Sequence, residues 1–181
     1  MVQGNRRIDK VLAEDFVNGL QALPLADVRE RRREAEQEET DLSYLRRVLQ
    51  GRLDILRAEL GRRAGDETDL VESLPRILAD ETGPSTHTPR GLGRHIAAEP
   101  SRADAHRRHV EALIADVDLS NPQAHDDASL KAVLLRLEDE ERRVSVQRRA
   151  VQGVMDVLTA EITRRYRDGD ADPSDLLPSE A

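Results

Sequence analysis

The sequence contains no cysteine and no tryptophan, and aromatic residues make up only 2% of its 181 residues. The absence of cysteine excludes disulfides, thiolate nucleophiles and cysteine-ligated zinc sites. The aromatic side chains, Phe16, Tyr44 and Tyr166, are too few for a thick core of interlocking rings. We therefore expect an aliphatic core that is buried between long helices.

Long apolar runs are also missing. No segment approaches the roughly 18 consecutive apolar residues that span a bilayer, and residues 1–10 lack the apolar region of a signal peptide. We therefore expect a cytoplasmic protein that does not bind membranes, and the lack of cysteine fits a reducing compartment.

The sequence has fewer basic than acidic side chains. The net charge is −8, with 36 acidic against 28 basic side chains. Repulsion from the phosphate backbone therefore disfavours direct binding to DNA or RNA. An acidic protein can still bind a basic protein surface, or a small anion where arginines are concentrated.

What the sequence does contain is a polar motif that occurs twice, E-x3-S-x2-R-x3-Q-x3-D. The steps of four, three, four and four residues keep the five side chains on one side of an α-helix. The first copy is Glu39, Ser43, Arg46, Gln50 and Asp54, and the second copy is Glu141, Ser145, Arg148, Gln152 and Asp156. Two matched stripes predict one two-fold site.

The similarity extends beyond the motif. A shift of 102 residues also pairs Arg47 with Arg149, Gly51 with Gly153, Leu56 with Leu158, Ala58 with Ala160 and Glu59 with Glu161. Other surface positions have diverged, such as Thr40 against Arg142 and Arg52 against Val154. A solvated helix face needs no particular residue, so the identical polar order in two copies favours a ligand site over a simply solvated surface.

Breakers and hydrophobic periodicity divide the chain, which we treat as a single domain over 1–181. Asp27 and Glu30 have the spacing of a capping box at the start of the first long helix. The expected segments are an amphipathic N-terminal segment over 1–23, a first long helix over 27–63, a connector over 64–128 with short helices near 69–80 and 102–117 and a flexible loop over 81–100, a second long helix over 129–168, and a disordered acidic tail over 169–181.

The predicted fold is all-α, an intramolecular antiparallel coiled coil of two long helices with short accessory helices. Each motif lies midway along its helix, so antiparallel pairing brings the two copies to the same height. At about 100° per residue, each apolar seam is centred about 80° to 90° from its motif stripe, with the same sense in both helices. The seams are Leu42, Leu45, Leu49, Leu53, Leu56 and Leu60, and Leu137, Val144, Val151, Met155, Leu158 and Ile162.

The residue types of the motif favour a guanine-bearing ligand. Arg46 and Arg148 present planar forks that suit phosphate or the O6/N7 edge of guanine. The motif carboxylates would repel phosphate, but they suit the N1–H and amino donors of the guanine Watson–Crick edge. Cyclic di-GMP has two guanines, two phosphates and a two-fold axis, so it fits both the chemistry and the repeat.

On these two complete motif copies, the chain resembles the RsiG family, the cyclic-di-GMP-responsive anti-sigma factors of Streptomyces and related actinobacteria. The motif match covers residues 39–54 and 141–156, and the paired-helix layout extends the resemblance over most of the chain. The resemblance implies that the ten motif residues contact a dimer of cyclic di-GMP. It also implies that the loaded protein sequesters the sporulation sigma factor WhiG, with one copy per sigma factor.

Two other functions remain open, a ligand-independent coiled-coil adaptor and a cyclic-nucleotide hydrolase. An exposed stripe offers no pocket that excludes water, and no metal-ligand cluster accompanies it, so we expect neither an enzyme nor a metal site. His106 and His109 have i,i+3 spacing, but arginines flank them and no third ligand is near in the sequence. We therefore expect both histidines to be surface residues.

Two residue pairs outside the motif have open interpretations. Arg47 and Arg149 directly follow the motif arginines and are either additional phosphate contacts or solvated side chains. Gly51 and Gly153 lie inside the helices, opposite the seam, at a cost of about 1 kcal/mol each relative to alanine. Close approach of another element would explain these glycines, and so would inheritance from a duplicated helix.

Overall fold

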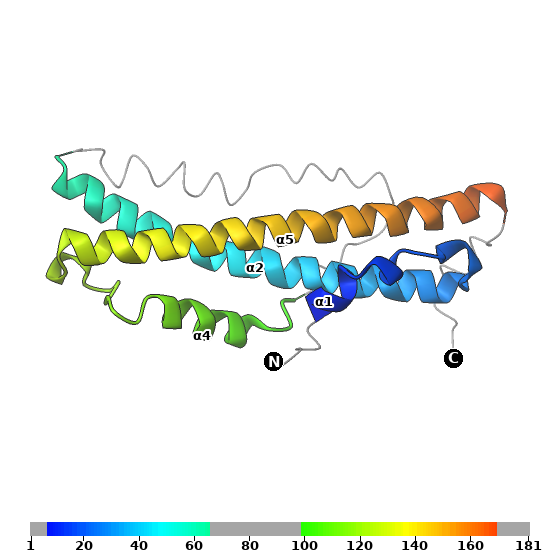
Figure 1. The fold of residues 1–181 in the computed structure, drawn as a ribbon, viewed down its shortest axis with the longest axis horizontal. Coiled ribbons are helices and arrows are strands. Elements are labelled where there is room, and N and C mark those ends of the chain that lie inside the picture. The colour runs from blue at the N-terminus through cyan, green and yellow to red at the C-terminus, as the bar shows by residue number, and fades with distance from the viewer. Residues whose placement is uncertain (1–6, 66–98, 170–181) are drawn as a thin grey trace. The chain divides into compact units, whose positions relative to one another are not determined.

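The computed structural model describes residues 7–65 and 99–169, and all regular structure in these ranges is helical (Figure 1). The all-α prediction is confirmed. None of the described helices is both long enough and apolar enough to cross a membrane. The elements are α1 (Arg7–Val11), the 3-10 helices η1 (Glu14–Phe16) and η2 (Leu20–Ala22), α2 (Leu25–Arg63), α4 (Ala103–Leu113), the 3-10 helix η3 (Pro122–Ala124) and α5 (Asp127–Asp168).

Both long helices begin two residues before the expected positions 27 and 129. In α2 the carbonyl of Pro24 accepts the amides of Asp27 at 3.1 Å and Val28 at 3.3 Å, so the first turn already includes Asp27. The expected capping box is therefore not the start of α2. In α5 the carboxylate of Asp126 accepts the Ser129 amide at 2.6 Å, which caps the helix just before Asp127.

The N-terminal segment differs from the single amphipathic helix that we expected over 1–23. It is broken into α1, η1 and η2, because Ala13 is extended between α1 and η1 and Gly19 has a φ of 67° between η1 and η2. The apolar side chains still point inward, and Ile8, Val11, Phe16 and Leu20 are all buried.

The connector is described only in part. The expected helix over 69–80, the expected loop up to residue 98 and the expected tail from residue 170 onward lie outside the described residues. The expected helix over 102–117 corresponds to α4, which ends at Leu113 and continues into turns.

Contacts divide the chain into two units, which we describe separately. The first unit consists of residues 1–46, 98–103 and 142–181, and the second unit consists of 47–97 and 104–141. The two units are built from equivalent elements of the 102-residue repeat. Each unit contains the first half of one long helix, the second half of the other long helix, and the short elements that precede that first half.

In the first unit, the second half of α5 runs antiparallel beside the first half of α2 (Figure 1, orange beside blue). Arg32 donates to Thr159 at 3.1 Å and Gln152 donates to Glu39 at 3.1 Å, so residue numbers fall along α5 as they rise along α2. The buried seam of this unit contains Val28, Ala35, Leu42, Leu45, Val144, Val151 and Leu158.

The second unit repeats this arrangement. Arg57 donates to Glu138 at 2.9 Å and Arg63 donates to Asp127 at 2.7 Å, so these helix halves are also antiparallel. The buried apolar residues are Leu49, Leu53, Leu56, Leu130, Val133 and Leu137, with Val110, Ile114 and Val117 from α4 and the turns after it. The predicted antiparallel pairing and seam are confirmed, although Leu60, Met155 and Ile162 are only partly buried.

A glutamate and two arginines near the end of each long helix close each unit; we call this set the arginine latch. In the first unit, Arg165 donates to the Glu161 carboxylate at 2.7 Å and to the carbonyls of Leu23 at 2.8 Å and Leu20 at 2.5 Å. Arg164 also donates to Glu161, at 3.0 Å. The latch therefore fixes η2, just before α2, to the end of α5.

The second unit has the same latch at the equivalent positions. Arg63 donates to Glu59 at 2.6 Å and to the carbonyls of His125 at 2.8 Å and Pro122 at 3.1 Å. Arg62 donates to Glu59 at 2.8 Å. Pro122 and His125 are the repeat equivalents of Leu20 and Leu23. The repeat is therefore conserved in three dimensions down to individual carbonyl acceptors.

We expect Arg165→Met to destabilise the protein more than Arg164→Met. The side chain of Arg165 is 7% exposed and its loss leaves the Leu20 and Leu23 carbonyls without this donor, whereas Arg164 is 36% exposed. Urea unfolding should show a loss of about 3 kcal/mol for Arg165→Met and about 0.5 kcal/mol for Arg164→Met. Equal losses would show that the carbonyl contacts of the latch do not stabilise the fold.

The latches also predict an acid limit to stability. Hydrogen bonds from Arg62 and Arg63 lower the pKa of Glu59 to about 2, and bonds from Arg164 and Arg165 lower the pKa of Glu161 to about 2, against an ordinary value of 4.5. A depressed carboxyl pKa adds stability that is fully present above the unfolded pKa and is lost as pH falls through the folded pKa.

The thermal unfolding midpoint should therefore stay constant above about pH 5 and fall between about pH 4.5 and 2. The double variant Glu59→Gln, Glu161→Gln should have a lower midpoint at neutral pH and a shallower fall. Glu30→Gln, at an exposed pair with Arg33, is the control and should match the wild-type profile. An unchanged acid profile in the double variant would contradict this explanation.

Candidate functional site

The ten motif residues lie on α2 and α5, midway along each helix as expected, and divide between the two units. The first unit contains Glu39, Ser43, Arg46, Ser145, Arg148, Gln152 and Asp156. The second unit contains Gln50, Asp54 and Glu141. Most of the motif residues therefore lie in the first unit.

Glu39 is the centre of a polar cluster that joins the two motif copies. Its Oε1 accepts hydrogen bonds from Ser43 Oγ at 2.9 Å, from Gln152 Nε2 at 3.1 Å and from Arg148 Nη1 at 3.3 Å. Ser43 is one turn along the same helix, whereas the other two donors come from α5. Four motif members, two from each copy, thus converge on one carboxylate oxygen.

Arg148 has unused donor capacity in this cluster. Its Nε is buried and has no acceptor among the residues that the structure describes. Its contact with Glu39 at 3.3 Å is longer than the 2.7–2.9 Å typical of charge-assisted bonds. A buried donor without an acceptor is unfavourable by about 1–3 kcal/mol. An additional planar acceptor at this position would relieve that cost.

The remaining motif side chains range from partly buried to exposed. Asp54, in the second unit, lies 3.9 Å from Arg57 and is 38% exposed, which makes a weak ion pair. Asp156 is exposed, and Arg46, Gln50, Ser145 and Glu141 are partly buried. Arg47 and Arg149 are both exposed, so each can contact either solvent or a bound group.

A buried acidic anchor beside Glu39 was not predicted from the sequence. Asp41 accepts from Arg7 Nη1 at 3.0 Å, from Ser101 Oγ at 2.7 Å and from the Arg102 amide at 3.3 Å. Burial raises the pKa of the neighbouring Glu38 carboxyl above its ordinary value, while Arg102 and Arg7 act in the opposite direction. The anchor holds the turn of α2 that presents Glu39.

The only hint of this anchor in the sequence is that two acidic residues, Glu38 and Asp41, share a helix face with the first seam. The partners of Asp41 are 34 and 60 residues away, at Arg7 and Ser101. Such distant pairing cannot be inferred from spacing.

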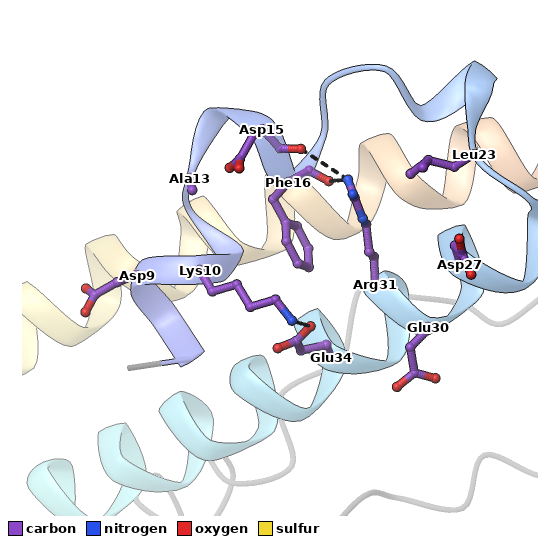
Figure 2. A pocket seen from close by; sticks show the side chains of 10 residues that line it. All are labelled: Asp9, Lys10, Ala13, Asp15, Phe16, Leu23, Asp27, Glu30, Arg31 and Glu34. Carbon is purple, nitrogen blue, oxygen red and sulfur yellow. Dashed lines mark hydrogen bonds and ion pairs between the residues drawn. The ribbon is translucent and has the colours of Figure 1, made fainter. Parts of the chain in front are cut away.

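A groove of about 840 Å³ lies between the N-terminal segment and the start of α2 (Figure 2). Lys10 donates to Glu34 at 2.5 Å, and Arg31 donates to the carbonyls of Phe16 at 2.6 Å and Asp15 at 3.1 Å. None of its lining residues belongs to the motif. The basic side chains of the groove bond to other groups of the protein. These contacts attach the N-terminal segment to α2.

The histidines do not form a metal centre in the described ranges, where no three His, Asp or Glu side chains converge in a way that would hold a metal ion. His109 lies on α4 and its Nε2 is 2.8 Å from Glu140 on α5. This contact is the repeat equivalent of the Arg7–Glu38 pair in the first unit, where the atoms are 3.8 Å apart. His109 therefore attaches α4 to α5 as Arg7 attaches α1 to α2.

Comparison with known proteins gives one family. The model of the RsiG-like family matches the chain twice, over residues 14–78 and 116–180. The two matches are offset by 102 residues, and each contains one motif copy and one arginine latch. No curated protein gives a significant match. Since the two matches cover well over half of the sequence, the chain belongs to the RsiG-like family, a regulatory family of anti-sigma factors.

Proposed function

We propose that this protein is an anti-sigma factor that binds cyclic di-GMP on its paired motifs and, when loaded, sequesters a WhiG-type sigma factor to repress its sporulation programme. The observation that carries the proposal is the cluster on Glu39, which joins Ser43 of one motif copy to Arg148 and Gln152 of the other. A single ligand spanning both helices would contact both copies.

The cluster has the donors and acceptors that guanine requires. Glu39 is an acceptor of three hydrogen bonds, and the guanine Watson–Crick edge offers N1–H and an amino group as parallel donors. Guanine can therefore replace the Gln152 and Arg148 donors on this carboxylate. Arg148 would then be available for an acceptor of its own.

Arg148 suits the acceptors of the same ligand. A guanidinium fork matches either the O6/N7 edge of guanine or a phosphate. The buried Nε of Arg148 without an acceptor would gain a partner on binding, so part of the binding free energy comes from relieving an existing cost.

Charge explains why ligand and sigma factor would bind together. Two cyclic di-GMP molecules, the stoichiometry that the RsiG resemblance implies, carry four negative charges beside a protein of net charge −8. The motif arginines offset part of this charge, and a basic surface on the sigma factor would offset more. The ligand then bridges one copy of the chain to one sigma factor, and its loss releases the sigma factor.

The alternative is a coiled-coil adaptor that needs no ligand. The bonds on Glu39 are complete without any added group, so the cluster could serve only to lock the two helices in register. The buried Nε of Arg148 favours the ligand site, because a purely structural cluster gains nothing from a donor without an acceptor.

Isothermal titration with cyclic di-GMP, in the presence and absence of the WhiG-type sigma factor, tests this proposal. We expect the sigma factor to tighten nucleotide binding by the same factor by which the nucleotide tightens sigma binding, because coupling between two sites is reciprocal. Cyclic di-AMP is the control ligand, since adenine lacks the N1–H donor and should bind far more weakly. If cyclic di-GMP binds in neither titration, the coiled-coil adaptor is the better explanation.

A further inference from the structure

The turn of α2 that presents Glu39 contains three carboxylates within four positions. Glu38 and Asp41 have i,i+3 spacing and therefore share a helix face. Both are buried, at 2% and 0% exposed, whereas the side chain of Glu39 is 21% exposed. Two buried charges of the same sign are unfavourable unless nearby cations offset them. The negative charge of this turn therefore has to be balanced by neighbouring side chains.

Two arginines outside the motif balance the buried pair. Arg7, on α1, lies 3.0 Å from Asp41 and 3.8 Å from Glu38. Arg102, directly before α4, lies 3.5 Å from Glu38, and its backbone amide donates to Asp41 at 3.3 Å. The two arginines come from segments far apart in the sequence, and all four residues belong to the first unit.

Arg148 completes the charge balance from α5, where it pairs with Glu39 at 3.3 Å. Among the groups that pair within 4.0 Å at this turn, three carboxylates meet three guanidinium groups, so the set is neutral. In the proposed function, Arg148 is the side chain that binds an acceptor of the nucleotide. Without the charge of Arg7 the set would have a net charge of −1, which would repel an anionic ligand and hold Arg148 more strongly.

The balance has little reserve. Burial raises the pKa of the Glu38 carboxyl, Arg102 and Arg7 lower it, and Asp41 and Asp9 raise it again. Since the net direction is upward, the two arginines do not fully offset burial and the neighbouring negative charges. Loss of either arginine would therefore change the electrostatic potential of the whole turn.

The second buried carboxylate is not a requirement of the repeat. A shift of 102 residues places Arg143 at the position of Asp41. The equivalent of Glu38 is Glu140, which is buried and contacts His109. The equivalent turn of α5 thus forms with one buried carboxylate, and the acidic pair with its two arginines belongs to the first motif copy.

We infer that Arg7 and Arg102 are positioning residues for an anionic nucleotide, because they neutralise the buried carboxylates beside Glu39. Arg148 is thereby left able to bind an acceptor of the ligand. The inference rests on the proposed function for the identity of the ligand. It adds the attachment of α1 and of the segment before α4 to the electrostatics of the binding site, although neither segment contains a motif residue.

Isothermal titration of cyclic di-GMP at low ionic strength into Asp41→Asn and Arg7→Met separates this electrostatic role from a structural one. Asp41→Asn removes one negative charge at nearly constant size, so we expect binding about fivefold tighter than in the wild type. Arg7→Met removes one positive charge, so we expect binding about fivefold weaker. A role confined to holding the turn in place predicts weaker binding in both variants, because both disturb the same hydrogen bonds.

Arg31→Met is the matched control. Arg31 also attaches the N-terminal segment to α2, through the carbonyls of Asp15 and Phe16, and its loss changes the net charge by the same amount. It pairs with none of the carboxylates of this turn in the described chain, so Arg31→Met should bind cyclic di-GMP as the wild type does. Arg7→Lys retains the charge and should recover most of the affinity that Arg7→Met loses.

Unchanged or weaker binding by Asp41→Asn would overturn the inference and leave the proposed function intact. Equal weakening by Arg7→Met and Arg31→Met would also overturn it, because the pairing at this turn would then have no specific effect. Circular dichroism verifies that each variant is folded, and if one of Asp41→Asn and Arg7→Met does not fold, the other decides. Absence of cyclic di-GMP binding by the wild type would overturn the proposed function, and the inference with it.

Discussion

Burial of the apolar seam between antiparallel α2 and α5 is the constraint on which the site depends. In the first unit the seam places Leu42 and Leu45 against the face of α5 that contains Val144 and Val151, and this register decides which polar side chains meet beside it. Glu39 accepts from Gln152 and Arg148 only in this register. A shift of one helical turn, about 5.4 Å, would separate these partners, so the cluster on Glu39 depends on the register that the seam and the latches impose together.

The two units of the repeat are held together in the same way. Each unit uses the same parts, a short helix attached through a buried glutamate, a 3-10 helix held by an arginine, and two antiparallel helix halves. The latch arginine of each helix binds carbonyls that precede the other helix, so neither repeat completes its unit alone. The fold therefore requires both repeats, which is the relation expected if, as proposed, one two-fold ligand is shared between the two motif copies.

The helices, the seam and the motif register could be predicted from the sequence because they follow from periodicity, which is a local property. Leu49 and Val151 are buried because their helical spacing places them in the apolar seams. The latches and the acidic anchor could not be predicted, because Arg165 binds backbone carbonyls, which every residue has, and Asp41 binds partners far away in the chain. The start of α2 was misplaced because Asp27 and Glu30 mimic a capping box inside a turn that Pro24 begins. The ten ligand contacts remain a prediction; the structure brings together four of these residues, Glu39, Ser43, Arg148 and Gln152.

The central claim is that the two motif copies form one composite site. Its most direct test is isothermal titration of cyclic di-GMP into the wild type and into Arg46→Ala and Arg148→Ala separately, with circular dichroism to verify that each variant is folded. We expect each substitution alone to weaken binding by a similar factor, about tenfold or more, because each arginine would serve the same ligand from its own helix. Loss of binding from one substitution and wild-type affinity in the other would contradict it.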